Sequence, residues 1–236
     1  MVTLTSWVGT SSGGSFERKG RPLLVKARRF VVSAFMGPDF EEERRMIAAG
    51  CLRIAGVDEV GRGPLAGPVT AAAVILDPNQ IPEGLQDSKK LSAARRVVLS
   101  EAIWRVARVS VGHASVEEID ALNILRASHL AMCRAVEGLD VLADYALIDG
   151  NMIPRDLRCP ATALIKGDGR SVSIAAASIV AKVVRDRIME DLAQQHPGYG
   201  WEQNAGYPTK AHRTALQNLG VTPHHRRSFK TIHNML

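Results

Sequence analysis

The sequence predicts an α/β domain, and three observations lead to this prediction. Short apolar runs of strand length alternate with longer segments in which apolar residues recur at helical spacing. Hydrophobic residues make up 46% of the 236 residues, which is enough for a sizeable core. Glycine-containing turns follow several of the apolar runs, as expected where strands end. Because the predicted strands and helices interleave, we expect a sheet packed against helices.

The first elements after Met36 are a short helix and two strands. FEEERRMIAAG, residues 40–50, has the composition of a short helix, and residues 52–57 and 69–76 are apolar runs of strand length. The glycine-rich turn between the two runs favours a hairpin-like pairing of these strands.

A capped helix, a third strand and a helical region follow. Ser92 is a suitable N-cap, and apolar residues then recur with the 3.6-residue period, at positions 94, 98, 99, 102, 103 and 106. Residues 106–116 predict a strand. Residues 117–138 predict a helical region, and the candidates for its inner face are Leu122, Leu125, Leu130, Cys133 and Val136.

The second half of the chain predicts two more strands and two helices. YALID (residues 145–149) and ATALIK (161–166) are short apolar runs typical of buried strands. Residues 171–192 predict a long helix that is apolar on almost all sides in its first half. A last helix over residues 209–219 would stop at Gly220.

Residues 1–35 differ in composition from the rest of the chain. They contain six Lys or Arg and one Glu, a net charge of +5, so the other residues carry only +1 of the total of +6. We expect a flexible basic extension here and one compact domain over residues 36–236. Three origins of the extension are open: an upstream start codon or vector sequence that is not native, a native disordered basic arm, and an organelle transit peptide.

Cysteine spacing argues against a zinc-binding protein, and hydropathy argues against a membrane-spanning protein. The three cysteines, at positions 51, 133 and 159, form no CxxC or paired-histidine zinc motif, and their use fits a reducing cytoplasm. The longest apolar runs, such as residues 71–76 and 174–181, fall short of the roughly 20 residues that span a bilayer. We therefore expect a cytoplasmic protein that does not span a membrane.

Four carboxylates stand at the ends of predicted elements. Asp58 and Glu59 follow the first strand, Asp149 ends the YALID strand, and Asp168 precedes the long helix. Functional groups of open α/β sheets collect at strand ends, and clustered carboxylates repel one another unless cations lie between them. Hard oxygen ligands suit Mg²⁺ or Mn²⁺, and two such ions about 3.5–4 Å apart can support phosphoryl transfer. The pattern therefore predicts a divalent-metal site.

Four motifs occur in order between residues 52 and 229. They are GVDEVGRGPLAGPV (56–69), LIDGN (147–151), IKGDGRSVSIAAASIVAKVVRDR (165–187) and GYPTKAH (206–212). Together they resemble the type 2 ribonucleases H, and most closely the bacterial ribonuclease HII family. The resemblance implies a ribonuclease H-like fold, with a mixed five-stranded sheet flanked by helices, and a catalytic domain over residues 36–236.

The resemblance also implies an activity. It indicates a metal-dependent endonuclease that cleaves RNA in RNA/DNA hybrids and nicks duplex DNA 5′ of embedded ribonucleotides, leaving 3′-hydroxyl and 5′-phosphate ends. The expected cofactor is Mn²⁺ or Mg²⁺, with two ions bound when substrate is present. The expected partners are nucleic acids, and we expect a monomer.

The same resemblance assigns roles to residues. The catalytic carboxylates that hold the metal ions would be Asp58, Glu59, Asp149 and Asp168. The ribose 2′-hydroxyl would be read by the backbone of Gly61, Arg62 and Gly63. Tyr207 would stack on the neighbouring deoxyribose. Glycine allows close approach of the backbone to a ligand, and the 2′-hydroxyl is the group that distinguishes RNA from DNA.

Basic residues near these motifs are candidate phosphate contacts, which would make binding weaken with salt. They are Lys89, Lys90, Lys182, Arg185 and the segment HHRRSFK, residues 224–230. The chain departs from the resembled family where Asn204 and Ala205 replace a His-Lys pair found in many relatives, and where Gly169 replaces Ser or Ala. Two alternative functions stay open: a catalytically silent nucleic-acid-binding module, and a metal-dependent phosphatase acting on small phosphoesters.

Overall fold

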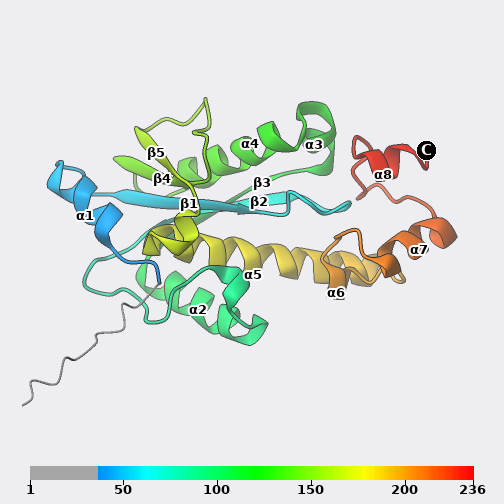
Figure 1. Cartoon of the computed structure of the whole chain (residues 1–236), viewed down its shortest axis with the longest axis horizontal. Helices are drawn as coiled ribbons and strands as arrows, with labels where there is room; N and C mark the ends of the chain where they lie inside the picture. The colour runs from blue at the N-terminus through cyan, green and yellow to red at the C-terminus, as the bar shows by residue number, and fades with distance from the viewer. Residues whose placement is uncertain (1–36) are drawn as a thin grey trace, which may run out of the picture. The chain divides into compact units, whose positions relative to one another are not determined.

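The computed structural model describes residues 37–236, so the extension expected over residues 1–35 lies outside the described residues. The strands of the described part (Figure 1) are β1 (Ile54–Val60), β2 (Val69–Ile75), β3 (Arg108–Ala114), β4 (Tyr145–Asp149) and β5 (Ala161–Leu164). Its α-helices are α1 (Glu41–Ala48), α2 (Ala93–Val106), α3 (Val116–Leu122), α4 (Ile124–Glu137), α5 (Val172–Gln195), α6 (Trp201–Asn204), α7 (Lys210–Leu219) and α8 (Lys230–His233). Short 3₁₀ helices, η1 (Ser88–Lys90) and η2 (Gly167–Gly169), precede α2 and α5.

The five strands form one mixed sheet in the order β3-β2-β1-β4-β5, which confirms the predicted sheet. β1 pairs antiparallel with β2, and β2 with β3, so the predicted hairpin-like pairing is also confirmed. β4 runs parallel to β1, and β5 parallel to β4. The C-terminal ends of β1 and β4 are therefore neighbours, with Val57 opposite Ile148.

Helices cover both faces of the sheet, with α4 on one face and α2 and α5 on the other (Figure 1). The side chains of a strand point alternately to the two faces, so β2 contributes to two cores. Ala73 packs in the core on the α4 side, whereas Ala72 and Val74 pack in the core formed with α2 and α5. Every residue of β2 is buried as a result.

Helix α5 spans 24 residues and contributes to three of the hydrophobic cores of the described residues. Its N-terminal part lies directly against β1, because a Cβ at Gly56 would come within 2.1 Å of the backbone carbonyl carbon of Ser173. Its C-terminal part belongs to a third core, with α6, α7 and α8, that contains Met189, Trp201 and Leu216. Despite this length, neither α5 nor any other helix described for residues 37–236 is apolar enough to cross a membrane.

The helical region predicted over residues 117–138 is in fact two helices, α3 and α4, which meet at Asn123. Asn123 has φ of 69° and ψ of 162°, a backbone conformation that residues other than glycine rarely adopt and that ends α3. Its side-chain oxygen accepts hydrogen bonds from the backbone N–H groups of Leu125 and Arg126, and so caps α4. The new N-terminus is stable because one residue supplies both the turn and the cap.

Other differences from the predicted elements are smaller. The N-cap at Ser92 is confirmed, because its hydroxyl accepts from the backbone N–H of Arg95, but Val98 on the predicted apolar face is 55% exposed. β1 ends at Val60, so it contains the acidic pair that the prediction placed after it. Helices α6 and α8 span four residues each and were not predicted, because so short a helix carries no periodic signal.

Candidate active site

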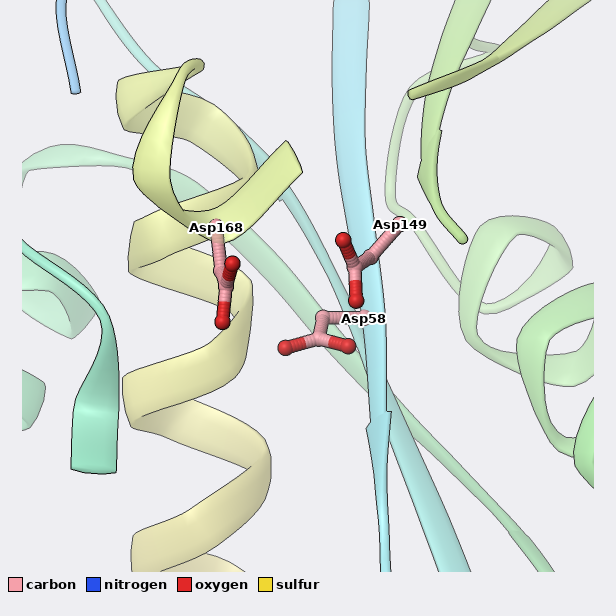
Figure 2. Close-up of side chains that lie close together, drawn as sticks. All are labelled: Asp58, Asp149 and Asp168. Atoms are coloured by element: carbon pink, nitrogen blue, oxygen red, sulfur yellow. The ribbon is translucent and has the colours of Figure 1, made fainter. Parts of the chain in front are cut away.

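Three carboxylates converge between β1, β4 and the start of α5 (Figure 2). Asp58 lies in β1, Asp149 ends the adjacent parallel strand β4, and Asp168 lies in η2. Each offers a carboxylate oxygen, and these oxygens lie within 4.8 Å of one another. The parallel pairing of β1 and β4 brings the first two together, and the turn before α5 adds the third.

The turn that carries Asp168 is fixed by backbone geometry. Lys166 has a left-handed backbone conformation, with φ of 55° and ψ of 43°. The backbone N–H of Gly167 donates a hydrogen bond of 2.7 Å to Oδ1 of Asp149. A Cβ at Gly167 would lie 2.6 Å from the Cδ1 atom of Ile174, so only glycine fits here without a shift. The same turn thus orients Asp149 and presents Asp168.

Burial and mutual repulsion raise the pKa values of two of these acids. Asp58 is 5% exposed, and burial, followed by the charges of Glu59 and Asp149, raises its pKa well above the ordinary value. A hydrogen bond with the Ser178 hydroxyl acts in the opposite direction. Burial and then the charge of Asp149 raise the pKa of Asp168. The anionic forms are therefore costly without a cation, which fits a metal-binding site.

Glu59, the fourth predicted carboxylate, lies outside this group of three. Adjacent residues of a strand point to opposite faces, so Glu59 turns away from Asp58. Its Oε1 atom accepts a hydrogen bond of 3.1 Å from Arg62. Burial raises the pKa of Glu59, and Arg62 opposes this shift. Glu59 and Asp149 nevertheless line one pocket of about 250 Å³, which also contains Arg62, His129 and Asn151.

The residues predicted to read the sugars also lie together. We call residues 61–67 the glycine loop. Gly61 has a positive φ of 93°, and a Cβ at Gly63 would lie 3.2 Å from the Cε1 atom of Tyr207, so the tyrosine ring lies against this loop. The Leu65 N–H donates a hydrogen bond of 2.7 Å to the carbonyl of Gly206. Tyr207 stays 42% exposed and is accessible to a ligand.

The predicted phosphate contacts fall into exposed and buried groups. Lys89 is exposed, and its Nζ atom lies 3.6 Å from Oδ2 of Asp168. Lys182 forms a partly buried ion pair of 2.6 Å with Asp186, one helical turn away on α5. Lys90 is exposed.

Arg185 and Arg226 are fully buried, so the prediction that they contact phosphate is wrong. Their guanidinium groups donate hydrogen bonds to backbone carbonyls instead. Within the segment 224–230, His225 is fully buried as well. The substituted Asn204 has a local structural role, because its Oδ1 atom accepts from the backbone N–H of Gly206.

Sequence reasoning missed Ser178 and Ser88, which support Asp58. The Ser178 hydroxyl lowers the pKa of Asp58, and it lies 2.8 Å from the hydroxyl oxygen of Ser88. Ser178 follows Ser171, the N-cap of α5, by two helical turns, so helical spacing could have placed it on the face toward β1. Ser88 had no comparable signal, because its approach depends on the packing of η1 against α5.

Comparisons with known proteins agree with this geometry. The family model for ribonuclease HII matches residues 55–232. A ribonuclease HII from Ruegeria pomeroyi is 73% identical over 199 residues, which cover 84% of this chain and 85% of that protein. The crystal structure of ribonuclease H2 from Pyrococcus horikoshii matches with a TM-score of 0.66 and 26% identity, covering 78% of this chain and 97% of the other.

A further solved structure is the complex of PCNA with RNase HII from Archaeoglobus fulgidus. It matches with a TM-score of 0.62 and 30% identity, and the match covers 76% of this chain and 96% of that chain. The family model spans most of the described domain and includes all four motifs. The chain therefore belongs to the ribonuclease HII family of metal-dependent endoribonucleases, which cleave RNA in RNA/DNA hybrids.

Proposed function

We propose that this chain, beyond cleaving hybrids, nicks duplex DNA on the 5′ side of an embedded ribonucleotide and leaves 3′-hydroxyl and 5′-phosphate ends. The observation that carries the proposal is that the two candidate contacts are joined by β1. Asp58 of β1 converges with Asp149 and Asp168, and the glycine loop, against which the Tyr207 ring lies, begins at the end of the same strand. Cutting and sugar recognition would then occur side by side.

The carboxylates fit Mg²⁺ or Mn²⁺ by their donor chemistry. Three oxygen donors within 4.8 Å are hard ligands, and the raised pKa values of Asp58 and Asp168 favour a cation between them. We propose that Asp58, Asp149 and Asp168 hold the metal, with Glu59 beside them, and that two ions bind in the presence of substrate. When bound, such ions stabilise the negative charge that develops on the attacking and leaving oxygens of the phosphodiester.

The chain's own residues would supply recognition. Arg62 and Gly63 are exposed at the tip of the glycine loop, so their backbone groups can bond a ribose 2′-hydroxyl. The exposed Tyr207 ring would contact the next sugar, which fits best when it lacks that hydroxyl. Lys89, and Lys182 after release from Asp186, would contact phosphates, so binding should weaken with salt.

A nicking assay tests the proposal. Duplexes with a single ribonucleotide, a continuous hybrid and an all-DNA duplex are compared in Mg²⁺ and in Mn²⁺. We expect cleavage of the first two substrates only, with the single-ribonucleotide duplex cut 5′ of the ribose. Asp149→Asn should reduce turnover to background with an unchanged circular dichroism spectrum.

The matched control is Asp140→Asn, because Asp140 is an exposed residue whose carboxylate pairs with Arg108 away from the cluster. Its turnover should equal that of the wild type. Cleavage that survives chelation of divalent ions would contradict the proposal. Binding of hybrid with no product after long incubation would instead favour a silent binding module.

We also propose the domain division, the assembly and the location. Residues 36–236 would be the catalytic domain, with residues 1–35 outside it, and the protein would act as a monomer in the cytoplasm. The support for a monomer is that Asp58, Asp149, Asp168 and Tyr207 all come from one chain. Light scattering during size-exclusion chromatography should give one mass near 25.5 kDa.

A further inference from the structure

The buried side chain of Arg226 forms hydrogen bonds with both ends of the glycine loop. Its Nη2 atom donates hydrogen bonds of 2.6 Å to the Gly61 carbonyl and 2.8 Å to the Gly67 carbonyl. Its Nη1 atom donates to the carbonyl of Arg62 at 3.1 Å. A fully buried guanidinium needs such partners, and here carbonyl oxygens accept hydrogen bonds from Nε, Nη1 and Nη2 of Arg226. The loop conformation and the position of Arg226 are thus fixed together.

Arg185 connects the same loop to the segment before Tyr207. From α5, its guanidinium donates to the carbonyl of Ala66 at 3.2 Å and to that of Ala205 at 3.0 Å. A Cβ at Gly61 would lie 2.2 Å from its Nε atom, so the loop packs directly on this side chain. The glycine loop and residues 205–207 therefore share a rigid support.

A buried histidine pair fixes Tyr207 on the other side. The Nδ1 atom of His212 lies 3.0 Å from the carbonyl oxygen of Tyr207, and a carbonyl only accepts, so Nδ1 carries the proton. The Nε2 atom of His212 is then an acceptor, for the indole N–H of Trp201 and for Nε2–H of His225, each at 3.1 Å. Both rings are fully buried.

His225 completes the same assignment and leads directly to Arg226. Its Nδ1 atom accepts from the backbone N–H of Thr222 at 3.0 Å and from the Thr222 hydroxyl at 2.9 Å. Every polar atom of the two rings thus has one consistent role with both rings neutral. Because His225 and Arg226 are adjacent, the residue that bonds to His212 and the residue that bonds to the Gly61 carbonyl belong to one short segment.

We propose that His212 and Arg226 are specificity-determining positioning residues: they fix the spacing between the glycine loop and Tyr207, and thereby select a ribose that is followed by a deoxyribose. The proposal rests on the function proposed above. Both side chains are fully buried, so they act through the loop and the tyrosine rather than by touching the substrate. Two sugars in a row can be read only if their two contacts keep a fixed separation, and a shift of the order of 1 Å is costly.

The predicted signature is a change in substrate preference. In a continuous hybrid the sugar facing Tyr207 is another ribose, so the tyrosine contributes less to cleavage than it does at a single ribonucleotide. Loss of spacing should therefore lower the ratio of kcat/KM for the single-ribonucleotide duplex to kcat/KM for the hybrid. Both substrates sample the same folded enzyme, so a partly unfolded variant does not change this ratio.

Two substitutions of His212 separate its two hydrogen-bonding edges. In His212→Asn the side-chain amide occupies about the place of Nδ1 and can still donate to the Tyr207 carbonyl. In His212→Gln the amide reaches the place of Nε2 and leaves that carbonyl without its donor. We expect the ratio to stay near the wild-type value in His212→Asn and to fall about 10-fold in His212→Gln.

Arg226→Lys tests the other contact, because an ammonium group cannot span both ends of the loop. It should also lower the ratio about 10-fold, whereas Arg213→Lys, at an exposed position of α7, should leave it unchanged. In a Tyr207→Ala background, Arg226→Lys should lower the ratio no further, because the tyrosine ring whose distance from the glycine loop Arg226 fixes is then absent.

Equal losses on both substrates, or an undiminished effect of Arg226→Lys without the tyrosine, would overturn the proposal. A wild-type enzyme that nicks the single-ribonucleotide duplex while the variants keep its preference would overturn this inference alone. A wild-type enzyme that fails to nick that duplex would overturn the proposed function, and this inference with it.

Discussion

Asp58 and Glu59 are neighbours in sequence, yet their carboxylates meet different partners because side chains alternate along β1. Glu59 turns toward Arg62, which supplies a cation from within the protein. Asp58 turns toward Asp149 and Asp168, where the nearest charges are also negative. One acid of the pair is therefore compensated internally, and the other depends on a cation from solution.

Two glycines form a matched pair for testing backbone requirements. Gly61 has φ of 93° and would place a Cβ 2.2 Å from Nε of Arg185, whereas a Cβ at Gly169 would meet nothing within 4 Å. We expect Gly61→Ala to destabilise the protein by roughly 2 kcal/mol or more. Gly169→Ala should be neutral or stabilise it by about 0.4–1 kcal/mol, because it restricts the unfolded chain. Urea unfolding measures the free energy of unfolding of each variant. Similar changes in the two variants would contradict the inference that only Gly61 requires glycine.

The buried histidine pair makes stability depend on pH. Burial, followed by the charge of His212, lowers the pKa of His225 to about 4, and the nearby His224 and His196 act in the same direction. The unfolded chain has a histidine pKa of about 6.5, so between these values the unfolded state binds a proton that the folded state does not. The stability that comes from keeping His225 neutral is therefore fully present above about pH 6.5 and is lost as the pH falls toward 4.

We expect the free energy of unfolding to fall by on the order of 1 kcal/mol per pH unit below pH 6.5. His225→Asn keeps an acceptor for Thr222 but removes the titrating ring, so its loss over the same range should be smaller. Urea unfolding at pH 7.5 and pH 5.5 gives both values. Parallel pH profiles for the two proteins would show that another group is responsible.

Helix α1 holds the turn that carries Asp168. Glu43 of α1 is 1% exposed, and its Oε1 atom accepts hydrogen bonds from the Ser171 hydroxyl at 2.5 Å and from the Ser173 N–H at 3.0 Å. These groups lie at the N-terminus of α5, where the helix dipole favours a negative charge. An element far from Asp168 in sequence thus fixes the residues that follow it.

Replacing Glu43 should therefore affect both stability and metal use. We expect Glu43→Ala to cost about 2–4 kcal/mol, because it leaves buried donors without partners. It should also raise the Mg²⁺ concentration needed for half-maximal cleavage about 10-fold, as loss of a group that orients a metal ligand does. Glu41→Ala, at an exposed position of the same helix, is the control for both measurements. A stability loss without any change in Mg²⁺ requirement would show that α1 does not position Asp168.

The elements differ in how far the sequence could predict them. Helix α2 and its cap at Ser92 are local features, so periodicity and capping chemistry were sufficient to predict them. The break at Asn123 was missed, because an apolar pattern continues across it and only one residue leaves the helical conformation. The proximity of Asp58 and Asp149 could be predicted, because functional groups of open α/β sheets collect at the ends of strands. The burial of Arg226 does not, because a charged side chain becomes internal only through contacts made by the whole fold.

At the scale of the whole molecule, charge is distributed unevenly. Residues 36–236 carry a net charge of only +1, and the candidate site concentrates carboxylates where a polyanionic substrate would lie. Attraction to nucleic acid must therefore come from bound metal ions, from exposed side chains such as Lys89, and from residues 1–35, which carry +5. Deleting residues 1–35 separates their contribution to binding from that of the metal ions and of the exposed side chains.

Deleting residues 1–35 should change binding without changing the fold. The family model matches residues 55–232, and the five-stranded sheet with its flanking helices is built from residues 37–236, so we expect the melting temperature and the kcat for hybrid cleavage to equal those of the full chain. Each cation that contacts phosphate adds about 0.9 to the steepness of the slope of log affinity against log salt, so loss of the six Lys and Arg residues of this segment should make the slope less steep by up to about 5. Fluorescence anisotropy with a labelled hybrid between about 50 and 200 mM salt measures it. An unchanged slope would show that these charges do not touch the substrate, whereas a lower melting temperature would show that the segment belongs to the folded domain.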